Sequence, residues 1–271
     1  MLVAESASAT DLTLRRGSGT VLQMSGVRSW PASTVTPMIR RLLLWDVDGT
    51  LVRTGEAGAM IFDEALQAVV GVRPKFRVRM SGKTDPQIVR EYLHEMGLEE
   101  LDDVVTEVLR VAAELLAEAD RRGELVSGGV TCPGVGDVLA RLASDHRVVS
   151  TLVTGNIAPN AVVKVAAFGL DRWLDLTIGA YGSDEADRRL LVPLALDRFA
   201  SLRGIRLDPS DAWVIGDTPR DLECARVAGV RCLLVATGRH DAEELTSLGA
   251  DEVLNDLSDI KAVVELLTGD L

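Results

Sequence analysis

The sequence predicts an α/β protein, with a doubly wound, Rossmann-like parallel sheet that carries an inserted all-helical domain. Two observations support this fold class. Short apolar runs with the length of buried strands alternate along most of the chain with helical patterns, as in proteins built from parallel strands and crossover helices. Residues 55–123 break the alternation, because apolar residues there recur almost entirely at helical spacing.

The expected strands are near-continuous apolar runs, the pattern of parallel strands buried on both faces. The first covers residues 41–46 and ends in a turn, and the others are expected at residues 148–153, 174–178, 212–215, 232–235 and, more weakly, 252–254. Helices are expected between them at residues 135–143, 159–168, 193–202, 221–228, 242–248 and 259–267.

The helical stretch predicts a separate cap domain, with helices at residues 60–70, 86–96 and 101–119 and a return to the sheet at Gly128 and Gly129. An insertion after the first strand lies over the carboxyl ends of the strands, where open α/β sheets bind ligands. We therefore expect a helical cap at residues 55–127, a core domain at residues 38–54 and 128–271, and a disordered leader at residues 1–37. Met24 and Met38 are alternative starts, so it is open whether the leader belongs to the native protein.

Composition and charge exclude some classes of function. With 47% apolar and 26% charged residues, the 271-residue chain has the balance of a globular protein. The net charge is −12 and no basic stripe stands out, so we expect no nucleic-acid partner. The apolar runs are too short to span a membrane. Three cysteines that match no zinc or redox motif favour a reducing, cytoplasmic compartment, and the oligomeric state is open.

The strongest chemical signal is the segment Asp46-Val47-Asp48-Gly49-Thr50, which follows the first expected strand. Two carboxylates two residues apart can both face the crevice once the chain turns at Gly49. One carboxylate can attack phosphorus, while the other protonates the leaving oxygen and later activates water. The alternative is a loop that uses Asp and Gly only for its turn.

Two later strand ends carry further polar groups. Thr154, Gly155 and Asn156 follow an expected strand, so a hydroxyl and backbone N–H groups could hold a phosphate there, although Thr154 or Asn156 could simply cap the next helix. Asp217 and Asp221 follow another strand, and carboxylate oxygens suit Mg²⁺. Asp221 could instead be an acid that the helix dipole favours in a first turn.

With these segments assembled, the chain resembles the haloacid dehalogenase superfamily of phosphohydrolases, particularly members like phosphoglycolate phosphatase, from about residue 42 to the end. Residues 46–50 match the family's first motif, Asp-x-Asp-Gly-Thr. Thr154 matches the second, a Thr or Ser at a strand end, and residues 216–221 match the fourth, Gly-Asp-x-x-x-Asp. Three motifs in order, each at an expected strand end, are more specific than any one of them.

The resemblance implies a role for each residue. Asp46 would form an aspartyl-phosphate, Asp48 would act as general acid and then base, and Thr154 would hold the phosphoryl group. Mg²⁺ would be bound by Asp46, by Asp48 through its backbone carbonyl, by Asp217 and, directly or through water, by Asp221. The loops around the phosphate would contact the substrate at Gly49, Thr50, Gly155 and Asn156.

The family's third motif is the one departure. It is usually a Lys just before a helix, and this chain has no Lys between Lys164 and Lys261. Measured back from Pro193, Arg188 is the best replacement and Arg189 the second, although either could be an ordinary surface arginine. An Arg supplies the charge, but its planar fork places its donors differently from an ammonium group.

In the expected cap, residues 81–86 resemble a Gly-Lys-Thr-Asp turn of capped phosphatases of this family. We expect Thr84 and Asp85 to contact the leaving group of the substrate, and Lys83 stays open as a further contact. The alternative is that Thr84 or Asp85 caps a helix that begins at Pro86.

The resemblance favours Mg²⁺-dependent hydrolysis of a small phosphorylated metabolite, whose identity is not readable from the sequence. A phosphosugar mutase on the same core is one alternative, but mutases of the family carry a His in the hinge, where this chain has Gly58. A non-catalytic phosphate-binding or regulatory relative is the other, and only the Lys-to-Arg departure supports it.

Overall fold

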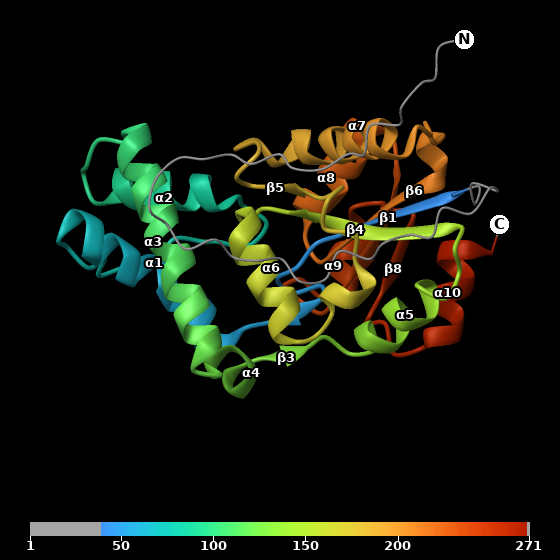
Figure 1. Ribbon diagram of the computed structural model, residues 1–271, viewed down its shortest axis with the longest axis horizontal. Helices are drawn as coiled ribbons and strands as arrows, with labels where there is room; N and C mark the ends of the chain where they lie inside the picture. Colours follow the sequence, from blue (N-terminus) through green and yellow to red (C-terminus); the bar gives the residue numbers. More distant parts are fainter. Residues whose placement is uncertain (1–38, 270–271) are drawn as a thin grey trace, which may run out of the picture. The chain divides into compact units, whose positions relative to one another are not determined.

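The computed structural model describes residues 39–269 (Figure 1), so the expected leader at residues 1–37 lies outside the described residues. Six parallel strands form a sheet in the order β5-β4-β1-β6-β7-β8. Their bounds are β1 (Arg41–Trp45), β4 (Val148–Thr154), β5 (Ala180–Tyr181), β6 (Ala212–Gly216), β7 (Arg231–Val235) and β8 (Glu252–Leu254). Because β1 pairs with β4 on one side and with β6 on the other, the first strand lies inside the sheet.

Helices cover both faces of this sheet. One face packs on α5 (Val135–Leu142), α6 (Ala158–Ala167) and α10 (Ile260–Thr268), and the other packs on α7 (Leu191–Arg203), α8 (Pro219–Ala228) and α9 (Ala242–Ser247). Figure 1 shows α7 and α8 on one side of the strands, and α5 and α10 on the other. Side chains alternate along β1, so Leu43 and Trp45 join one buried cluster and Leu42 and Leu44 the other. The predicted doubly wound α/β fold is confirmed.

One expected strand, at residues 174–178, is wrong. The chain forms a short 3₁₀-helix, η1 (Asp171–Trp173), and then turns before the edge strand β5. Asp175 explains the turn, because its carboxylate accepts hydrogen bonds from the backbone N–H and the hydroxyl of Thr177, at 3.1 and 2.6 Å. Leu174 and Ile178 are buried all the same, which gives this segment the apolar pattern of a strand without strand pairing.

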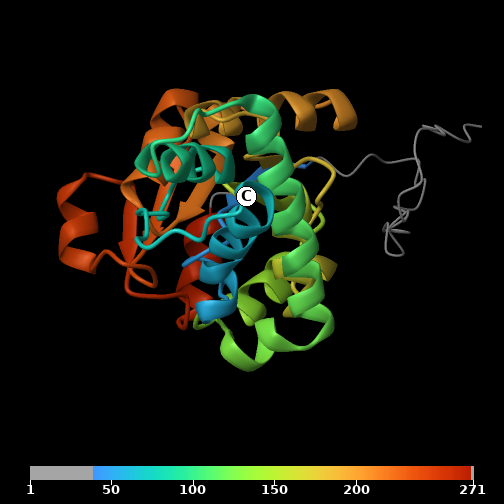
Figure 2. The same ribbon diagram turned by 90° about the vertical axis from the view of Figure 1, so that its left-hand side faces the viewer.

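Between Arg53 and Val130 the chain forms four helices, α1 (Gly55–Val70), α2 (Asp85–Glu95), α3 (Asp102–Arg121) and α4 (Glu124–Gly128), called the insertion below. They share an apolar cluster of their own, and in Figure 2 they face the viewer. Two antiparallel strands, β2 (Val52–Arg53) and β3 (Val130–Thr131), join the insertion to the core. Strands of two residues are too short to give a readable pattern, so the sequence did not predict them.

Helix α6 lies between the sheet and the insertion. Ala161 and Val165 belong to the buried cluster on the sheet, whereas Val163 and Ala167 pack against the apolar cluster of the insertion. This helix of the core therefore contacts both parts of the protein.

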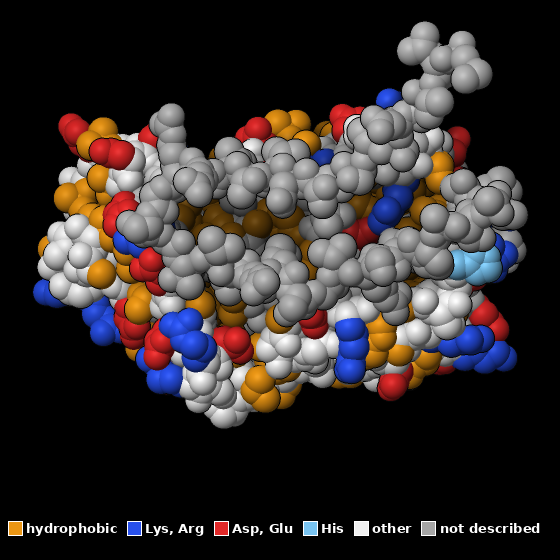
Figure 3. Space-filling view, in the orientation of Figure 1, with side chains coloured by type: hydrophobic (Ala, Val, Ile, Leu, Met, Phe, Trp, Pro, Cys, Tyr) orange, Lys and Arg blue, Asp and Glu red, His pale blue; other side chains and the backbone are white. Residues whose placement is uncertain are grey.

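Within residues 39–269, no helix is both long enough and apolar enough to cross a membrane. On the face drawn in Figure 3, basic and acidic side chains are interspersed outside the grey atoms. This distribution agrees with the mixed charge pattern of the sequence.

Candidate active site

Three buried carboxylates meet at the carboxyl ends of β1 and β6. Asp46 follows β1, and Asp217 follows the neighbouring strand β6. Asp221 lies in the first turn of α8. One oxygen from each of the three carboxylates lies within 4.8 Å of the other two, and all three residues are buried. Two motifs that are far apart in the sequence thus form one acidic cluster, made of Asp46, Asp217 and Asp221.

Close backbone packing surrounds Asp217. Gly49 has a φ of +87°, a conformation that suits glycine, and a Cβ there would lie 2.4 Å from Asp217 Oδ2. A Cβ at Gly238 would lie 1.7 Å from the same oxygen. Thr50 Oγ1 donates a hydrogen bond to Asp217 Oδ1 at 3.2 Å. The turn at Gly49 therefore also leaves the space that the Asp217 carboxylate fills.

Arg188 brings a positive charge to the acidic cluster. It lies in a 3₁₀-helix, η2 (Arg188–Leu190), just before α7, and its Nη2 is 3.0 Å from Asp46 Oδ2 and 2.5 Å from Asp221 Oδ1. The side chain of Arg189 is 60% exposed and pairs with Asp187. Of the two arginines that the sequence offers in place of the motif lysine, Arg188 is the one that reaches the carboxylates.

Burial and like charges perturb the acidic cluster. Burial raises the pKa of Asp46 to about 6, against the opposing effect of Arg188. Burial and the carboxylates of Asp221 and Asp46 raise the pKa of Asp217 to about 8. Burial disfavours the charged form of Arg188, but the carboxylates of Asp221 and Asp46 outweigh it and raise the pKa of Arg188 well above its ordinary value. One guanidinium therefore leaves three carboxylates with excess negative charge.

Asp48 lies outside the acidic cluster, and its carboxylate turns toward α6. Lys164 Nζ donates to both carboxylate oxygens, at 2.8 and 2.6 Å, and Asn156 Nδ2 donates to Oδ2 at 2.7 Å. Asn156 also donates to Thr154 Oγ1 at 2.9 Å. Neither Thr154 nor Asn156 caps α6, whose N-cap residue is Ile157. The end of β4 is therefore joined to Asp48 by one hydrogen-bond network.

Thr84 is the N-cap of α2. Its Oγ1 accepts a hydrogen bond from the backbone N–H of Gln87 at 3.4 Å and donates to the carbonyl of Ala186 at 2.9 Å. Its neighbour Lys83 pairs with Glu91. The structure thus gives both side chains partners within the protein, and a substrate contact of either stays a prediction.

Asp85 links the insertion to the core. Its backbone N–H donates to Gly155 O at 2.7 Å, and its Oδ2 accepts from Ile157 N–H at 2.9 Å and from Asn160 Nδ2 at 3.2 Å. The carboxylate therefore lies at the N-terminus of α6, where a helix favours negative charge. Burial raises the pKa of Asp85 to about 6, although Lys164 opposes the rise. The expected contact of Asp85 with substrate also stays a prediction.

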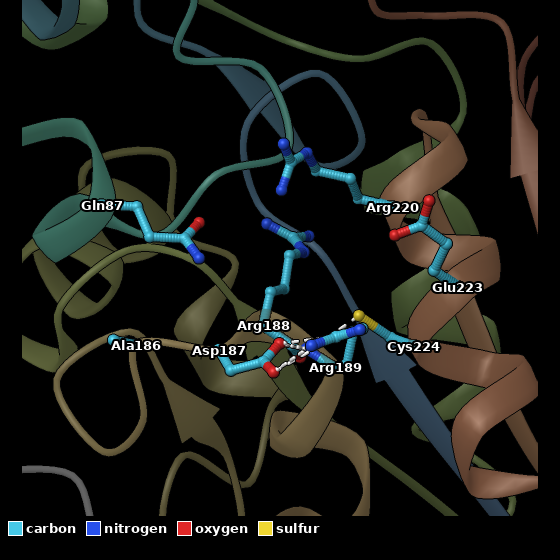
Figure 4. A pocket seen from close by; sticks show the side chains of 8 residues that line it. All are labelled: Gln87, Ala186, Asp187, Arg188, Arg189, Arg220, Glu223 and Cys224. Carbon is cyan, nitrogen blue, oxygen red and sulfur yellow. Dashed lines mark hydrogen bonds and ion pairs between the residues drawn. The ribbon is translucent and has the colours of Figure 1, made fainter. Parts of the chain in front are cut away.

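A pocket of about 410 Å³ lies beside Arg188 (Figure 4). In Figure 4, Gln87 from α2, Arg188 from η2 and Arg220 from α8 extend toward one another. Within residues 39–269, Arg220 has no hydrogen bond or ion pair with another side chain, whereas Arg188 is held by the acidic cluster. The remaining lining residues are Ala186, Asp187, Arg189, Glu223 and Cys224.

Lys164 is the residue at this site that the sequence did not predict. The family pattern places its lysine just before α7, whereas this lysine comes from α6. A signal was present, because Asn160 and Lys164 are polar residues four apart in a largely apolar helix, and both are buried. Residues four apart share one face of a helix, so a buried polar face there indicates a polar partner.

The acidic cluster fits Mg²⁺. This ion takes hard oxygen ligands and needs few protein carboxylates, and the cluster supplies three whose oxygens converge within 4.8 Å. Burial and, after it, the carboxylates of Asp221 and Asp46 raise the pKa of Asp217, and a divalent cation bound there would offset the charge of these carboxylates. Asp46, Asp217 and Asp221 would hold the ion, while the side chain of Asp48 is engaged by Lys164.

Comparison with known proteins gives matches over most of the chain. A family model described as HAD-hydrolase-like matches residues 191–260. Validoxylamine A 7'-phosphate phosphatase of Streptomyces hygroscopicus subsp. limoneus is 27% identical over 228 residues, which cover 82% of this chain and 96% of the relative. Phosphoglycolate phosphatase of Pectobacterium atrosepticum is 25% identical over 226 residues, 83% of this chain and 92% of the relative.

The fold also has relatives among solved structures. The crystal structure of CbbY from Rhodobacter sphaeroides in complex with phosphate matches with a TM-score of 0.64 and 24% identity, and covers 82% of this chain and 96% of that chain. The likeness extends through both the sheet and the insertion, which together make up most of the described residues. The family model over residues 191–260 and the two named phosphatases make this chain similar to phosphatases among the haloacid dehalogenase-like hydrolases, and the solved structure shares its fold.

Proposed function

We propose that the protein hydrolyses a small phosphate monoester in a Mg²⁺-dependent reaction that passes through an aspartyl-phosphate on Asp46. The observation that carries the proposal is the convergence of the buried carboxylates of Asp46, Asp217 and Asp221, two of which, Asp46 and Asp221, pair with the buried guanidinium of Arg188. The substrates named for the two relatives, validoxylamine A 7'-phosphate and phosphoglycolate, are small phosphate esters, which supports the same class of substrate here.

In the first step, a carboxylate oxygen of Asp46 would attack phosphorus, and the bond from phosphorus to the leaving oxygen would break. Arg188 Nη2, 3.0 Å from Asp46 Oδ2, places positive charge beside the nucleophile and the phosphoryl group that it receives. Thr154 Oγ1 accepts a hydrogen bond from Asn156, so its own hydroxyl proton is available to a phosphoryl oxygen. When bound, Mg²⁺ would polarise the phosphoryl oxygens and offset the charge of the carboxylates.

Proton transfer would be the task of Asp48. It would give a proton to the leaving oxygen, and in the second step it would take one from the water that attacks the aspartyl-phosphate. That attack would release inorganic phosphate and restore the Asp46 carboxylate. The Asp48 side chain is 45% exposed, so solvent and a leaving group can reach it.

The mutase alternative would need a proton-carrying residue in the hinge. At the corresponding position, Gly58 packs on Thr54 so closely that a Cβ would lie 2.1 Å from Thr54 Oγ1. The binding-protein alternative would not need a nucleophile, a metal cluster and a general base to lie at the same edge of the sheet. Both observations favour a hydrolase.

The experiment is an assay of p-nitrophenyl phosphate hydrolysis with Mg²⁺, with EDTA, and with Asp46→Asn. We expect turnover only with the parent protein and Mg²⁺, and an acid-stable phosphoenzyme signal that Asp46→Asn lacks. Asp197→Asn, at an exposed position on α7, is the matched control and keeps parental activity. Parental turnover by Asp46→Asn, or full activity in EDTA, would refute the proposed mechanism.

We also infer that the protein works in a reducing, cytoplasmic compartment. Cys132, Cys224 and Cys232 are all free and buried. Burial raises the pKa of the Cys224 thiol to about 12, which keeps it protonated and unreactive at neutral pH. A melting temperature that is the same with and without a reductant is the expected result.

A further inference from the structure

Lys164 is a buried lysine to which the proposed reaction gives no role. Its side chain is only 10% exposed, and it lies in the middle of α6 between Ala161 and Val165, which face the sheet. An ammonium group has three donors, and Lys164 Nζ has three acceptors: both oxygens of Asp48, at 2.8 and 2.6 Å, and Asn156 Oδ1, at 2.7 Å. Burying a charge is costly unless it is paired, so this lysine is placed for its partners.

Asn156 completes the arrangement around Asp48. Its Oδ1 accepts from Lys164, and its Nδ2 donates both to Asp48 Oδ2 at 2.7 Å and to Thr154 Oγ1 at 2.9 Å. The Asp48 carboxylate is therefore held by two different donors, although 45% of its side chain is exposed. A half-exposed carboxylate in a loop would otherwise sample several rotamers.

Each of the two cations of the site contacts one of the two carboxylates of the first motif. Arg188, just before α7, contacts Asp46, whereas Lys164, from α6 on the other face of the sheet, contacts Asp48. The chain thus has an arginine before α7 and, in addition, a lysine from a different helix.

We propose that Lys164 is a positioning residue for Asp48, which it holds, together with Asn156, in the orientation that takes a proton from the hydrolytic water. The inference rests on the proposed function, in which Asp48 is the general base of the second step. The contacts with Lys164 and Asn156 suit that step, because the base must be aligned with the water from which it takes the proton. Without Lys164, the aspartyl-phosphate would still form but would be hydrolysed slowly.

The test separates the two steps with p-nitrophenyl phosphate in a stopped-flow experiment. Nitrophenolate leaves without a proton, so Lys164→Met is expected to form the phosphoenzyme at close to the parental rate. Its steady-state turnover should fall by about 10²-fold, the range of a misplaced general base. The time course then shows a burst of about one nitrophenolate per active site followed by slow release, and acid-quenched Lys164→Met accumulates phosphoenzyme.

Two further variants make the result specific. Lys164→Arg keeps a cation and is expected to recover part of the steady-state rate. Lys261→Met removes an 85% exposed lysine in α10 and should behave like the parent protein. Melting temperatures of all variants report folding, and if Lys164→Met does not fold, Lys164→Gln is measured by the same two-step criterion.

A role of Lys164 in packing alone would slow burst and steady state by the same factor, and this result would overturn the inference. Parental steady-state turnover by Lys164→Met would overturn it as well. A parent protein without Mg²⁺-dependent turnover or phosphoenzyme would instead refute the proposed function, and with it the role of Asp48. The outcomes therefore separate an error about Lys164 from an error about the reaction.

Discussion

Asp217 is expected to destabilise the metal-free protein, so Asp217→Asn should raise its stability. Burial and the carboxylates of Asp221 and Asp46 raise the pKa of Asp217 from 3.8 to about 8. Because folding raises this pKa, the Asp217 carboxyl group contributes to the stability of the folded protein at low pH. This contribution is lost as the pH rises from about 4 to about 8. At about 1.4 kcal/mol per pKa unit, the loss has a ceiling of about 4 kcal/mol at pH 7.

The expected gain from Asp217→Asn is smaller than this ceiling, because the folded protein relaxes around a charge. Replacing buried ionic groups with neutral ones of similar size often stabilises a protein by about 1–4 kcal/mol. Asn keeps an oxygen that can accept the hydrogen bond of Thr50. For a chain of this size, each kcal/mol moves the melting temperature by about 2–4 °C.

The assay is thermal melting at pH 7, first in EDTA and then with increasing Mg²⁺. In EDTA, the melting temperature of Asp217→Asn should exceed that of the parent protein. Asp197→Asn, at an exposed position, should melt at the parental temperature. With Mg²⁺ at 100 times its dissociation constant, the parent should gain about 2.7 kcal/mol that Asp217→Asn does not. If Asp217→Asn melts lower in EDTA, the reasoning about buried charge is wrong. Equal stabilisation of both proteins by Mg²⁺ would place the ion elsewhere.

Three further outcomes can be checked. Arg188→Met is expected to lower kcat by about 10²–10³-fold, because the only cation that contacts Asp46 among the described residues is lost. Arg188→Lys should lower kcat by a smaller factor. Equal kcat values for the parent and the two variants would contradict this expectation. Burial raises the pKa of Asp85 to about 6, so the parent should lose stability between about pH 4 and pH 6, and urea unfolding of Asp85→Asn should show a flatter pH profile over that interval. Arg220→Ala should raise KM with little change in kcat for esters whose leaving group is anionic, and a KM equal to the parent's for these esters would remove Arg220 from the binding site.

Most of the fold could be predicted because strands buried on both faces are continuous apolar runs. Each side chain of β1 faces one of two apolar layers, so the run from Leu42 to Trp45 has no polar position. The run at residues 174–178 instead alternates apolar residues with Asp175 and Thr177, and the hydrogen bonds of Asp175 to Thr177 turn the chain there. The side-chain hydrogen bonds of Asp175 favour a turn over a strand there, and the pattern of apolar residues alone does not show this.

The acidic cluster could be predicted because Asp46 and Asp217 follow strands, Asp221 lies in the first turn of the helix after the second of these strands, and the carboxyl ends of parallel strands share one edge of a sheet. The other contacts made by side chains from helices could not be predicted. Lys164 reaches Asp48 from the middle of α6, and Asp85 lies at the N-terminus of the same helix only because the insertion packs there. Such contacts depend on how two packed parts meet. The spacing of Asn160 and Lys164 indicates a polar partner for that face of α6 but does not identify the partner.

The paired strands β2 and β3 have a consequence for the evolution and engineering of this protein. Val52 faces Thr131 and Arg53 faces Val130, so the chain leaves the core and comes back to it at neighbouring points. A segment whose two ends lie next to each other can be exchanged for a longer, shorter or unrelated segment without a change in the order of the strands in the sheet. The insertion and the sheet edge that carries the acidic cluster can therefore diverge at different rates, and chimaeras cut at β2 and β3 are expected to exchange the insertion while leaving the sheet intact.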